Sequence, residues 1–290
     1  MSIRSASAAG PAYQWCRALA RSHHENFPVA SLLLPGRLRD PVAAIYAFAR
    51  TADDIADTPG VAADSRLHKL NDMAIALDSI EQEGTPDTLM FQALADTIRR
   101  HRLPLKPFRD LLSAFRQDVS KTRYSDFAEV MDYCRRSANP VGELMLHLTG
   151  QLSEHRLSLS NAICSALQLI NFLQDIEEDY RNNHRIYLPV DEMQRFAVCE
   201  DDIEQRRNSP RFHDLIQLQI ERAAELLRSG SPLGRRITGR FGLELRAITL
   251  GGMRILEKLR NRDDLFDPPR LTAKDRRRIV WCALKQGIQG

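Results

Sequence analysis

Apolar residues recur along most of the chain at spacings of three and four, which is the periodicity of amphipathic α-helices. Alternating apolar and polar runs bounded by turns, which are typical of half-buried strands, are scarce. The pattern therefore predicts an all-α fold. The expected helices cover 12–24, 41–58, 64–82, 86–102, 105–121, 125–149, 158–182, 212–229, 240–261 and 272–287.

Short breaks rich in proline and glycine separate these segments, for example LPGRLRDP at 34–41, RLPLKP at 102–107 and FDPPRLT at 266–272. No fixed-period repeat, low-complexity tract or clear linker divides the sequence. With 290 residues, of which 43% are hydrophobic, the chain can bury a sizeable core. We expect a single domain over residues 1–290.

Composition narrows the class of function only slightly. The chain has 41 Lys and Arg against 38 Asp and Glu, a net charge of +3, so overall charge gives no argument for nucleic-acid binding. The five cysteines are widely spread, with no C-x-x-C spacing and no secretory signal ahead of them, so we expect reduced thiols in a cytoplasmic protein. No apolar run approaches the ~20 residues that cross a bilayer, so any membrane contact would be peripheral.

The segment YAFARTADDIAD places several charges on an otherwise apolar helix. At helical spacing Tyr46, Arg50, Asp53 and Asp57 share one face, and Asp54 lies at its edge. Like charges four residues apart repel, so a cation should offset them. A hard divalent cation such as Mg²⁺ is one candidate, and an exposed acidic face closed by an ion pair with Arg50 is the alternative.

A second apolar helix repeats this arrangement in ALQLINFLQDIEEDYRNNHRIYLP at 166–189. Gln168, Asn171, Asp175 and Asp179 are spaced three, four and four, and Glu178 lies beside them. If the two helices face each other, their aspartates form a negative cavity that cations stabilise. Mg²⁺ held in this way keeps open positions for phosphate oxygens, and nearby arginines can neutralise the rest of a diphosphate.

Two other classes of site lack support. A di-iron or di-manganese bundle would use Glu together with Glu-x-x-His pairs, and no E-x-x-H occurs on either acidic face. The sequence also contains neither the P-loop nor the G-x-G-x-x-G pattern, so nucleotide binding has no motif.

The motifs as a set resemble the squalene/phytoene synthase family of head-to-head prenyl synthases, which has the class I isoprenoid fold. The resemblance covers most of the chain and is carried by SHHENFPVASLLLP, YAFARTADDIAD, YCRRSANPVGELM and LQLINFLQDIEEDYRNNHRIYLP. Within the family, the combination of HHENFPVAS, FARTADDIAD, AFRQDVSKTRY and YCRRSANPVG is most similar to the bacterial hopanoid-pathway branch, which makes hydroxysqualene from presqualene diphosphate.

The resemblance implies roles for individual residues. The aspartates expected to act in the reaction are Asp53, Asp54, Asp57, Asp175 and Asp179. The expected Mg²⁺ ligands are Asp53, Asp57, Asn171, Asp175 and Asp179. The expected substrate-binding residues are His23, Tyr46, Arg50, Tyr133, Gln168, Asn171, Arg185 and Tyr187. Gln174 departs from the many relatives that have Arg before this aspartate, which fits an enzyme that ionises a single diphosphate.

The implied reaction is Mg²⁺-dependent ionisation of presqualene diphosphate followed by capture of the cation by water, so no NADPH is expected. The alternatives are a squalene or phytoene synthase that condenses two prenyl diphosphates, and a non-catalytic lipid-binding or assembly protein on the same fold. We expect a prenyl diphosphate as the substrate, functional coupling to neighbouring pathway enzymes and no nucleic-acid partner.

Three further features of the sequence predict local structure or contacts. Pro140 should kink the helix at 125–149, and Gly142 should allow a close approach there. The basic turn at 121–123 is expected to be solvated rather than bound to phosphate. The run KDRRRIVWCALKQG at 274–287 places basic residues beside an apolar stripe; most such helices dock on their own domain, and a minority lie on anionic membranes.

Overall fold

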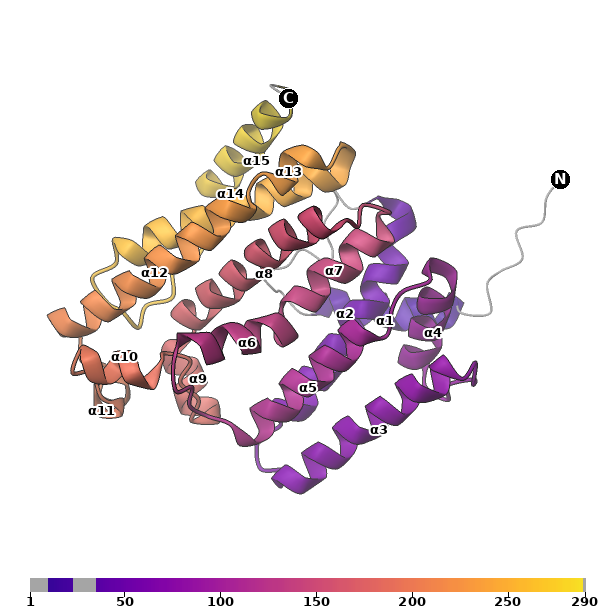
Figure 1. Cartoon of the computed structure of the whole chain (residues 1–290), viewed down its shortest axis with the longest axis horizontal. Coiled ribbons are helices and arrows are strands. Elements are labelled where there is room, and N and C mark those ends of the chain that lie inside the picture. The colour runs from indigo at the N-terminus through magenta and orange to yellow at the C-terminus, as the bar shows by residue number, and fades with distance from the viewer. Residues whose placement is uncertain (1–9, 23–34, 289–290) are drawn as a thin grey trace. The chain divides into compact units, whose positions relative to one another are not determined.

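The computed structural model describes residues 10–22 and 35–288, and within these ranges it consists of helices and turns with no strand (Figure 1). No helix in the same ranges is long and apolar enough to cross a bilayer. The helices are α1 (Gly10–Ser22), α2 (Gly36–Asp57), α3 (Ala63–Glu81), α4 (Leu89–His101), α5 (Lys106–Ser120), α6 (Phe127–Ser137), α7 (Asn139–Leu148), α8 (Glu154–Gln174), α9 (Ile176–Asn183), α10 (Val190–Arg195), α11 (Glu200–Glu204), α12 (Pro210–Gly230), α13 (Leu233–Arg236), α14 (Gly239–Arg260) and α15 (Ala273–Ile288).

The helices form two compact units. Unit 1 contains Met1–Val119 and Leu144–Gln151, and unit 2 contains Ser120–Glu143 and Leu152–Gly290. The predicted all-α class is confirmed, and a single domain over the whole chain stays a prediction.

The core of unit 1 forms where α2 packs against α1 and α4. Phe48 of α2 is fully buried and makes edge-to-face contacts with Phe91 and Phe108, at centroid distances of 6.1 and 5.4 Å. Five of the ten buried residues of α2 are alanines, which lets neighbouring helices approach closely. The acidic motif is therefore carried by a helix whose opposite face is held in a packed core.

Helix α2 begins earlier than expected. The expected break at 34–41 is wrong, because the helix starts at Gly36 and includes Pro41. Pro41 lies in the second turn, where it removes the hydrogen bond that its own N–H would have donated to Arg37 O and crowds that carbonyl, yet the helix continues through it. A proline so close to a helix start does not end the helix.

Unit 2 is organised around α8 and α12, which lie side by side, with α14 packed on both and α15 packed on α14 (Figure 1). Two glycines, Gly230 of α12 and Gly252 of α14, permit this close approach of the helices. A Cβ at Gly252 of α14 would lie 2.8 Å from Leu227 Cδ2 and 3.2 Å from Leu167 Cδ2. These contacts fix α8, the helix that carries the second acidic motif, against two others.

Two long expected helices are interrupted. The segment at 125–149 divides into α6 and α7 just before Pro140, as the proline predicts. Gly142 allows a close approach, as expected, because a Cβ there would collide with the side chains of Ser160 and Cys164 on α8. The segment at 158–182 divides into α8 and α9 at Asp175.

Helices α10, α11 and α13 were not expected, because each is too short to give a periodic pattern.

The packing of α12 on α8 predicts the effect of Gly230→Ala. The new Cβ would lie 2.6 Å from the carbonyl oxygen of Leu159 and 3.0 Å from the backbone nitrogen of Ile163. Because backbone atoms cannot rotate away, we expect a loss of about 1–3 kcal/mol in the free energy of unfolding. Thermal and urea denaturation followed by circular dichroism measures it. Gly36→Ala, which meets nothing within 4 Å, is the matched control; equal stability of the two variants would contradict this account.

Candidate active site

The first acidic motif lies on the last three turns of α2 in unit 1. Its four face residues are all partly buried, whereas Asp54 at the edge is exposed. Arg50 is 3.3 Å from Asp53 Oδ2 through Nη1 and 2.7 Å from Asp54 Oδ1 through Nη2. The ion pair that the alternative interpretation required is thus present. Asp53 and Asp54 thus share the Arg50 guanidinium, and Asp57 lies one turn beyond Asp53 on the same face.

The second acidic motif spans the junction of α8 and α9 in unit 2. The expected continuous helix is interrupted at Asp175, whose φ of −106° and ψ of 18° depart from helical values. The backbone hydrogen bonds still continue through the junction, because Asp175 N donates to Asn171 O at 2.9 Å and Asp179 N donates to Asp175 O at 2.8 Å. Asn171, Asp175 and Asp179 therefore stay in helical succession, and all three are partly buried, as is Gln168 one turn earlier.

Asp175 lies in an environment that favours a nearby cation. Burial, with a smaller contribution from the negative charge of Glu178, raises the pKa of Asp175 to about 6, and the positive charge of Arg270 opposes this rise. A raised carboxyl pKa means that the protein's own groups do not fully compensate the ionised form. Carboxylate and amide oxygens are also the ligands that Mg²⁺ prefers, so the donor set fits this metal.

The metal ligands expected from sequence divide between the units. Asp53 and Asp57 belong to unit 1, and Asn171, Asp175 and Asp179 belong to unit 2. Among residues 10–22 and 35–288, no three His, Cys, Asp or Glu side chains form a group that could hold a metal ion. The joint use of both acidic motifs stays a prediction.

A backbone pairing positions the segment that follows α9. Helix α9 ends at His184, whose positive φ of 49° turns the chain. Ile186 N then donates to Thr122 O at 3.0 Å, and Val190 N donates to Tyr124 O at 2.9 Å. These bonds lie on either side of Tyr187, so two chain segments hold its backbone in place.

Arg123 stabilises this backbone pairing at the end that contains Thr122 and Ile186. Its Nε and Nη2 donate to the two carboxylate oxygens of Glu200 at 2.7 and 2.5 Å, and Nη1 donates to the carbonyl oxygen of His184. Lys121 is ion-paired with Glu129. These contacts give the basic turn a structural role within unit 2.

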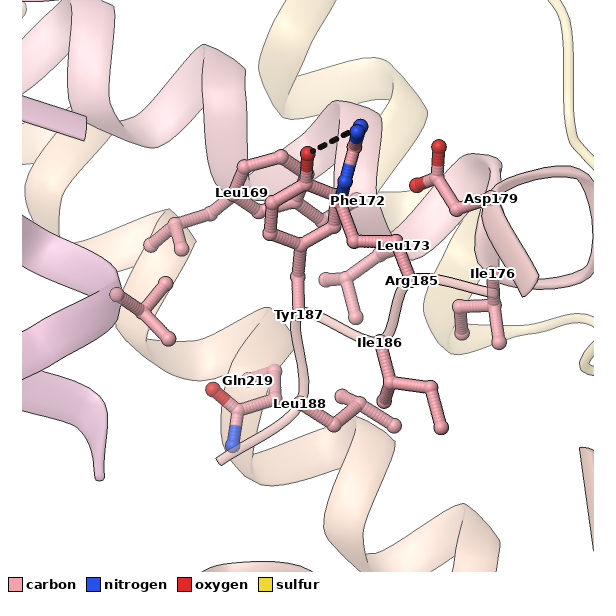
Figure 2. A pocket seen from close by; sticks show the side chains of 11 residues that line it. Leu169, Phe172, Leu173, Ile176, Asp179, Arg185, Ile186, Tyr187, Leu188 and Gln219 are labelled. Atoms are coloured by element: carbon pink, nitrogen blue, oxygen red, sulfur yellow. Dashed lines mark hydrogen bonds between the residues drawn. The ribbon is translucent and has the colours of Figure 1, made fainter. Parts of the chain in front are cut away.

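Arg185 and Tyr187 border a small cavity of about 20 Å³ in unit 2. Arg185 is only 5% exposed, and its Nη1 donates to the Tyr187 hydroxyl at 3.2 Å. Figure 2 shows the Asp179 carboxylate, the Arg185 guanidinium and the Tyr187 hydroxyl pointing toward the same side. The cavity is lined by Val130, Leu169, Phe172, Leu173, Ile176, Asp179, Arg185, Ile186, Tyr187, Leu188 and Gln219.

Four aromatic rings gather beside this cavity. Tyr187 stacks on Phe172 with a centroid distance of 3.6 Å and an interplanar angle of 9°. Tyr133 contacts both of these rings at 5.5 and 6.0 Å, and Tyr124 lies 5.4 Å from Tyr187. The cluster places π faces near the polar groups, and such faces attract a positive charge. Sequence reasoning missed Phe172 and Tyr124, although Phe172 directly follows the predicted ligand Asn171.

The remaining predicted positions have simpler outcomes. Gln174 has a structural contact, because its Nε2 donates to Pro269 O at 2.8 Å. Nearby, Arg262 Nη2 donates to Leu173 O at 3.1 Å, so the loop after α14 is bound to the end of α8. Tyr46 is partly buried on α2 in unit 1. His23 lies outside the described residues.

Comparisons with known proteins agree with the motifs. The profile of the squalene/phytoene synthase family matches residues 20–281. Hydroxysqualene synthase of Rhodopseudomonas palustris is 39% identical over 84% of this chain and 82% of its own length, and that of Zymomonas mobilis is 36% identical over 84% and 81%. The crystal structure of squalene synthase HpnC from Alicyclobacillus acidocaldarius is 36% identical, with a TM-score of 0.81 over 90% of this chain and 97% of that one.

The backbone pairing predicts that Arg123→Gln loosens the segment that carries Arg185. Without the guanidinium the contacts to Glu200 and His184 are lost, and we expect the amide of Ile186 to exchange with solvent roughly tenfold faster. Hydrogen exchange measured by mass spectrometry or NMR tests this. Arg135→Gln, which removes the same charge from an exposed pair with Asp132, should leave the rate unchanged. Equal rates in both variants would show that Arg123 does not hold the segment.

Proposed function

Because the chain belongs to the squalene/phytoene synthase family, we propose that it is a hydroxysqualene synthase, which converts presqualene diphosphate and water into hydroxysqualene and diphosphate. Relatives with this name are 34–39% identical to the chain. The single structural observation that carries the proposal is the buried Arg185, placed between an aspartate and stacked aromatic rings. Anion binding and cation stabilisation are thereby available side by side.

The proposed metal is Mg²⁺, bound by oxygens of Asp53, Asp57, Asn171, Asp175 and Asp179. Mg²⁺ would neutralise the diphosphate and so make it a better leaving group. The support is the chemistry of the donors and the incompletely compensated charge at Asp175. Asp54, which is exposed and paired with Arg50, is proposed to act through that arginine.

The arginines are proposed to bind the diphosphate directly. Arg185 is fixed by burial and by its bond to Tyr187, so its guanidinium is already oriented before substrate arrives. Arg50 has a similar chemistry on α2, where an incoming diphosphate would compete with two aspartates. Tyr46, Gln168 and the undescribed His23 are proposed to contact other parts of the substrate.

The aromatic cluster is proposed to stabilise the carbocation. When the C–O bond breaks, both electrons leave with the diphosphate, and the hydrocarbon carries the positive charge. The rings of Tyr133, Phe172 and Tyr187 present π electrons to such a charge and exclude bulk water from it. A single water then adds its oxygen to the cation and loses a proton. No reductant enters this balance, so NADPH is not required.

The proposal places the enzyme after a reaction that makes presqualene diphosphate and before one that consumes hydroxysqualene. We propose that neighbouring pathway enzymes carry out these steps. A substrate and product with long hydrocarbon chains make direct transfer between such enzymes chemically reasonable.

The direct test is product identification. Purified protein incubated with Mg²⁺ and presqualene diphosphate should release hydroxysqualene with or without NADPH, because water supplies the terminating atom. Mass spectrometry identifies the product. Squalene formed only with NADPH, or consumption of farnesyl diphosphate as the starting substrate, would instead support a squalene synthase, the name carried by the Alicyclobacillus relative.

Variants test the assigned residues in the same assay. Asp175→Asn should lower kcat/KM by about a hundredfold or more, because a charged ligand of the leaving-group site is lost. Asp72→Asn is a matched control, since this aspartate is 58% exposed on α3 and only faces His68. An Asp53→Asn, Asp175→Asn double variant that still forms product normally would favour the non-catalytic alternative.

A further inference from the structure

Helix α15 is fixed in orientation by its inward face. Asp275 is 6% exposed and forms ion pairs with two residues of α14. Its Oδ1 lies 2.7 Å from Arg254 Nε, and its Oδ2 lies 2.7 Å from Lys258 Nζ. Ala283, two turns later, is fully buried, and its carbonyl oxygen accepts a bond of 2.8 Å from Arg246 Nε. Because both ends of this face are attached to α14, the opposite face is held toward solvent.

That outward face is apolar at its centre. Val280, Trp281 and Leu284 are 51%, 57% and 49% exposed, although each is a large hydrophobic residue. Their i, i+1, i+4 spacing puts them on one side of the helix. They account for three of the seven large hydrophobic residues exposed within residues 10–22 and 35–286, and among these seven they are the only three that share one helix face. Clustered exposure of this kind marks an interaction surface, whereas single exposed residues do not.

Positive charge surrounds the apolar centre. Five exposed basic residues lie on the same helix, and its one acidic residue, Asp275, is already paired on the inward face. The Lys285 ammonium lies 3.7 Å from the Trp281 ring centroid, so a cation sits directly over the exposed aromatic. The five basic residues are Lys274, Arg276, Arg277, Arg278 and Lys285.

We propose that this face of α15 binds the surface of a membrane that contains anionic lipids. The helix would lie in the interface, with Val280, Trp281 and Leu284 inserted among the acyl chains and the basic side chains on phosphate groups. Tryptophan is well suited to this depth, because its ring is apolar and its N–H is polar. The inference is independent of the reaction proposed above, since α15 contributes no residue to the candidate active site.

The positive charge on this face of α15 favours a lipid surface over a second copy of the chain as its binding partner. In a symmetric dimer the same face would meet itself, and five positive charges would oppose five others. Anionic lipid instead supplies the opposite charge along with an apolar phase. Basic and apolar groups on one fixed face are therefore complementary to a lipid surface and not to each other.

Vesicle binding tests the proposal on the full chain. The protein should cosediment with vesicles of equal parts phosphatidylcholine and phosphatidylglycerol, and bind pure phosphatidylcholine vesicles at least tenfold more weakly. The chain has two tryptophans, so in a Trp15→Phe background the emission of Trp281 should shift to the blue when anionic vesicles are added. Trp15 is itself 40% exposed on α1, so its removal leaves one exposed reporter.

Charge variants provide the matched comparison. Replacing Arg276, Arg277 and Arg278 by Gln should weaken binding to anionic vesicles about a hundredfold, since each basic residue near such a surface contributes roughly a factor of five to ten. Replacing three exposed arginines elsewhere in unit 2, Arg195, Arg211 and Arg228, removes the same charge and should change binding far less. Circular dichroism checks that both triple variants are folded.

Three results would overturn the proposal. The first is equal binding to neutral and anionic vesicles, and the second is equal weakening by the two triple variants. The third is a wild-type dimer in light scattering that Trp281→Ser dissociates, together with no vesicle binding. That last result would assign the face to a second copy.

Discussion

Carboxylates on the partly buried faces of two otherwise apolar helices create the electrostatic requirement on which the account depends. On α2 Asp53 and Asp54 share the Arg50 guanidinium, and at the junction of α8 and α9 burial raises the pKa of Asp175 to about 6. Such carboxylates cost stability unless cations compensate them. A protein that has both motifs therefore binds cations. A diphosphate bound together with Mg²⁺ supplies such cations, and this diphosphate is also the leaving group of the proposed reaction. The partly buried negative charge that destabilises the folded protein is thus the same charge that would bind the metal ions.

The second requirement is that an arginine and aromatic rings be held in fixed positions beside the carboxylates of unit 2. Unit 2 achieves this with backbone pairing between residues 122–125 and 186–191, which fixes Arg185 and Tyr187 although both lie outside helices. Arg123 secures one end of the pairing through Glu200 and His184. Close packing of α8 on α12 and α14, made possible by Gly230 and Gly252, fixes the other wall through Phe172. Rigid support of this kind explains why side chains on a connecting segment can be preoriented.

Helical periodicity was sufficient for the fold class, and the resemblance of the motifs to the squalene/phytoene synthase family was sufficient for the family; both are confirmed. They also placed Asp54 at the edge of the α2 face and anticipated the break before Pro140. They failed where long-range contacts decide. The hydrogen bond from Gln174 to Pro269 and the stacking of Phe172 on Tyr187 involve partners that local pattern does not reveal, and no pattern indicated the change of backbone angles at Asp175. The early start of α2 was missed because proline was read as a stop, although the helix runs through Pro41 despite the lost hydrogen bond and the crowded carbonyl of Arg37.

The central claim is that the acidic motifs bind diphosphate through a cation and not by themselves. Isothermal titration calorimetry of the purified protein with inorganic diphosphate, with and without Mg²⁺, tests this most directly. The account predicts tight binding with Mg²⁺, at least about a hundredfold weaker binding without it, and loss of this difference in Asp175→Asn, because metal and anion bind cooperatively. Diphosphate that binds equally well without Mg²⁺, or whose Mg²⁺ dependence survives Asp175→Asn, would contradict it.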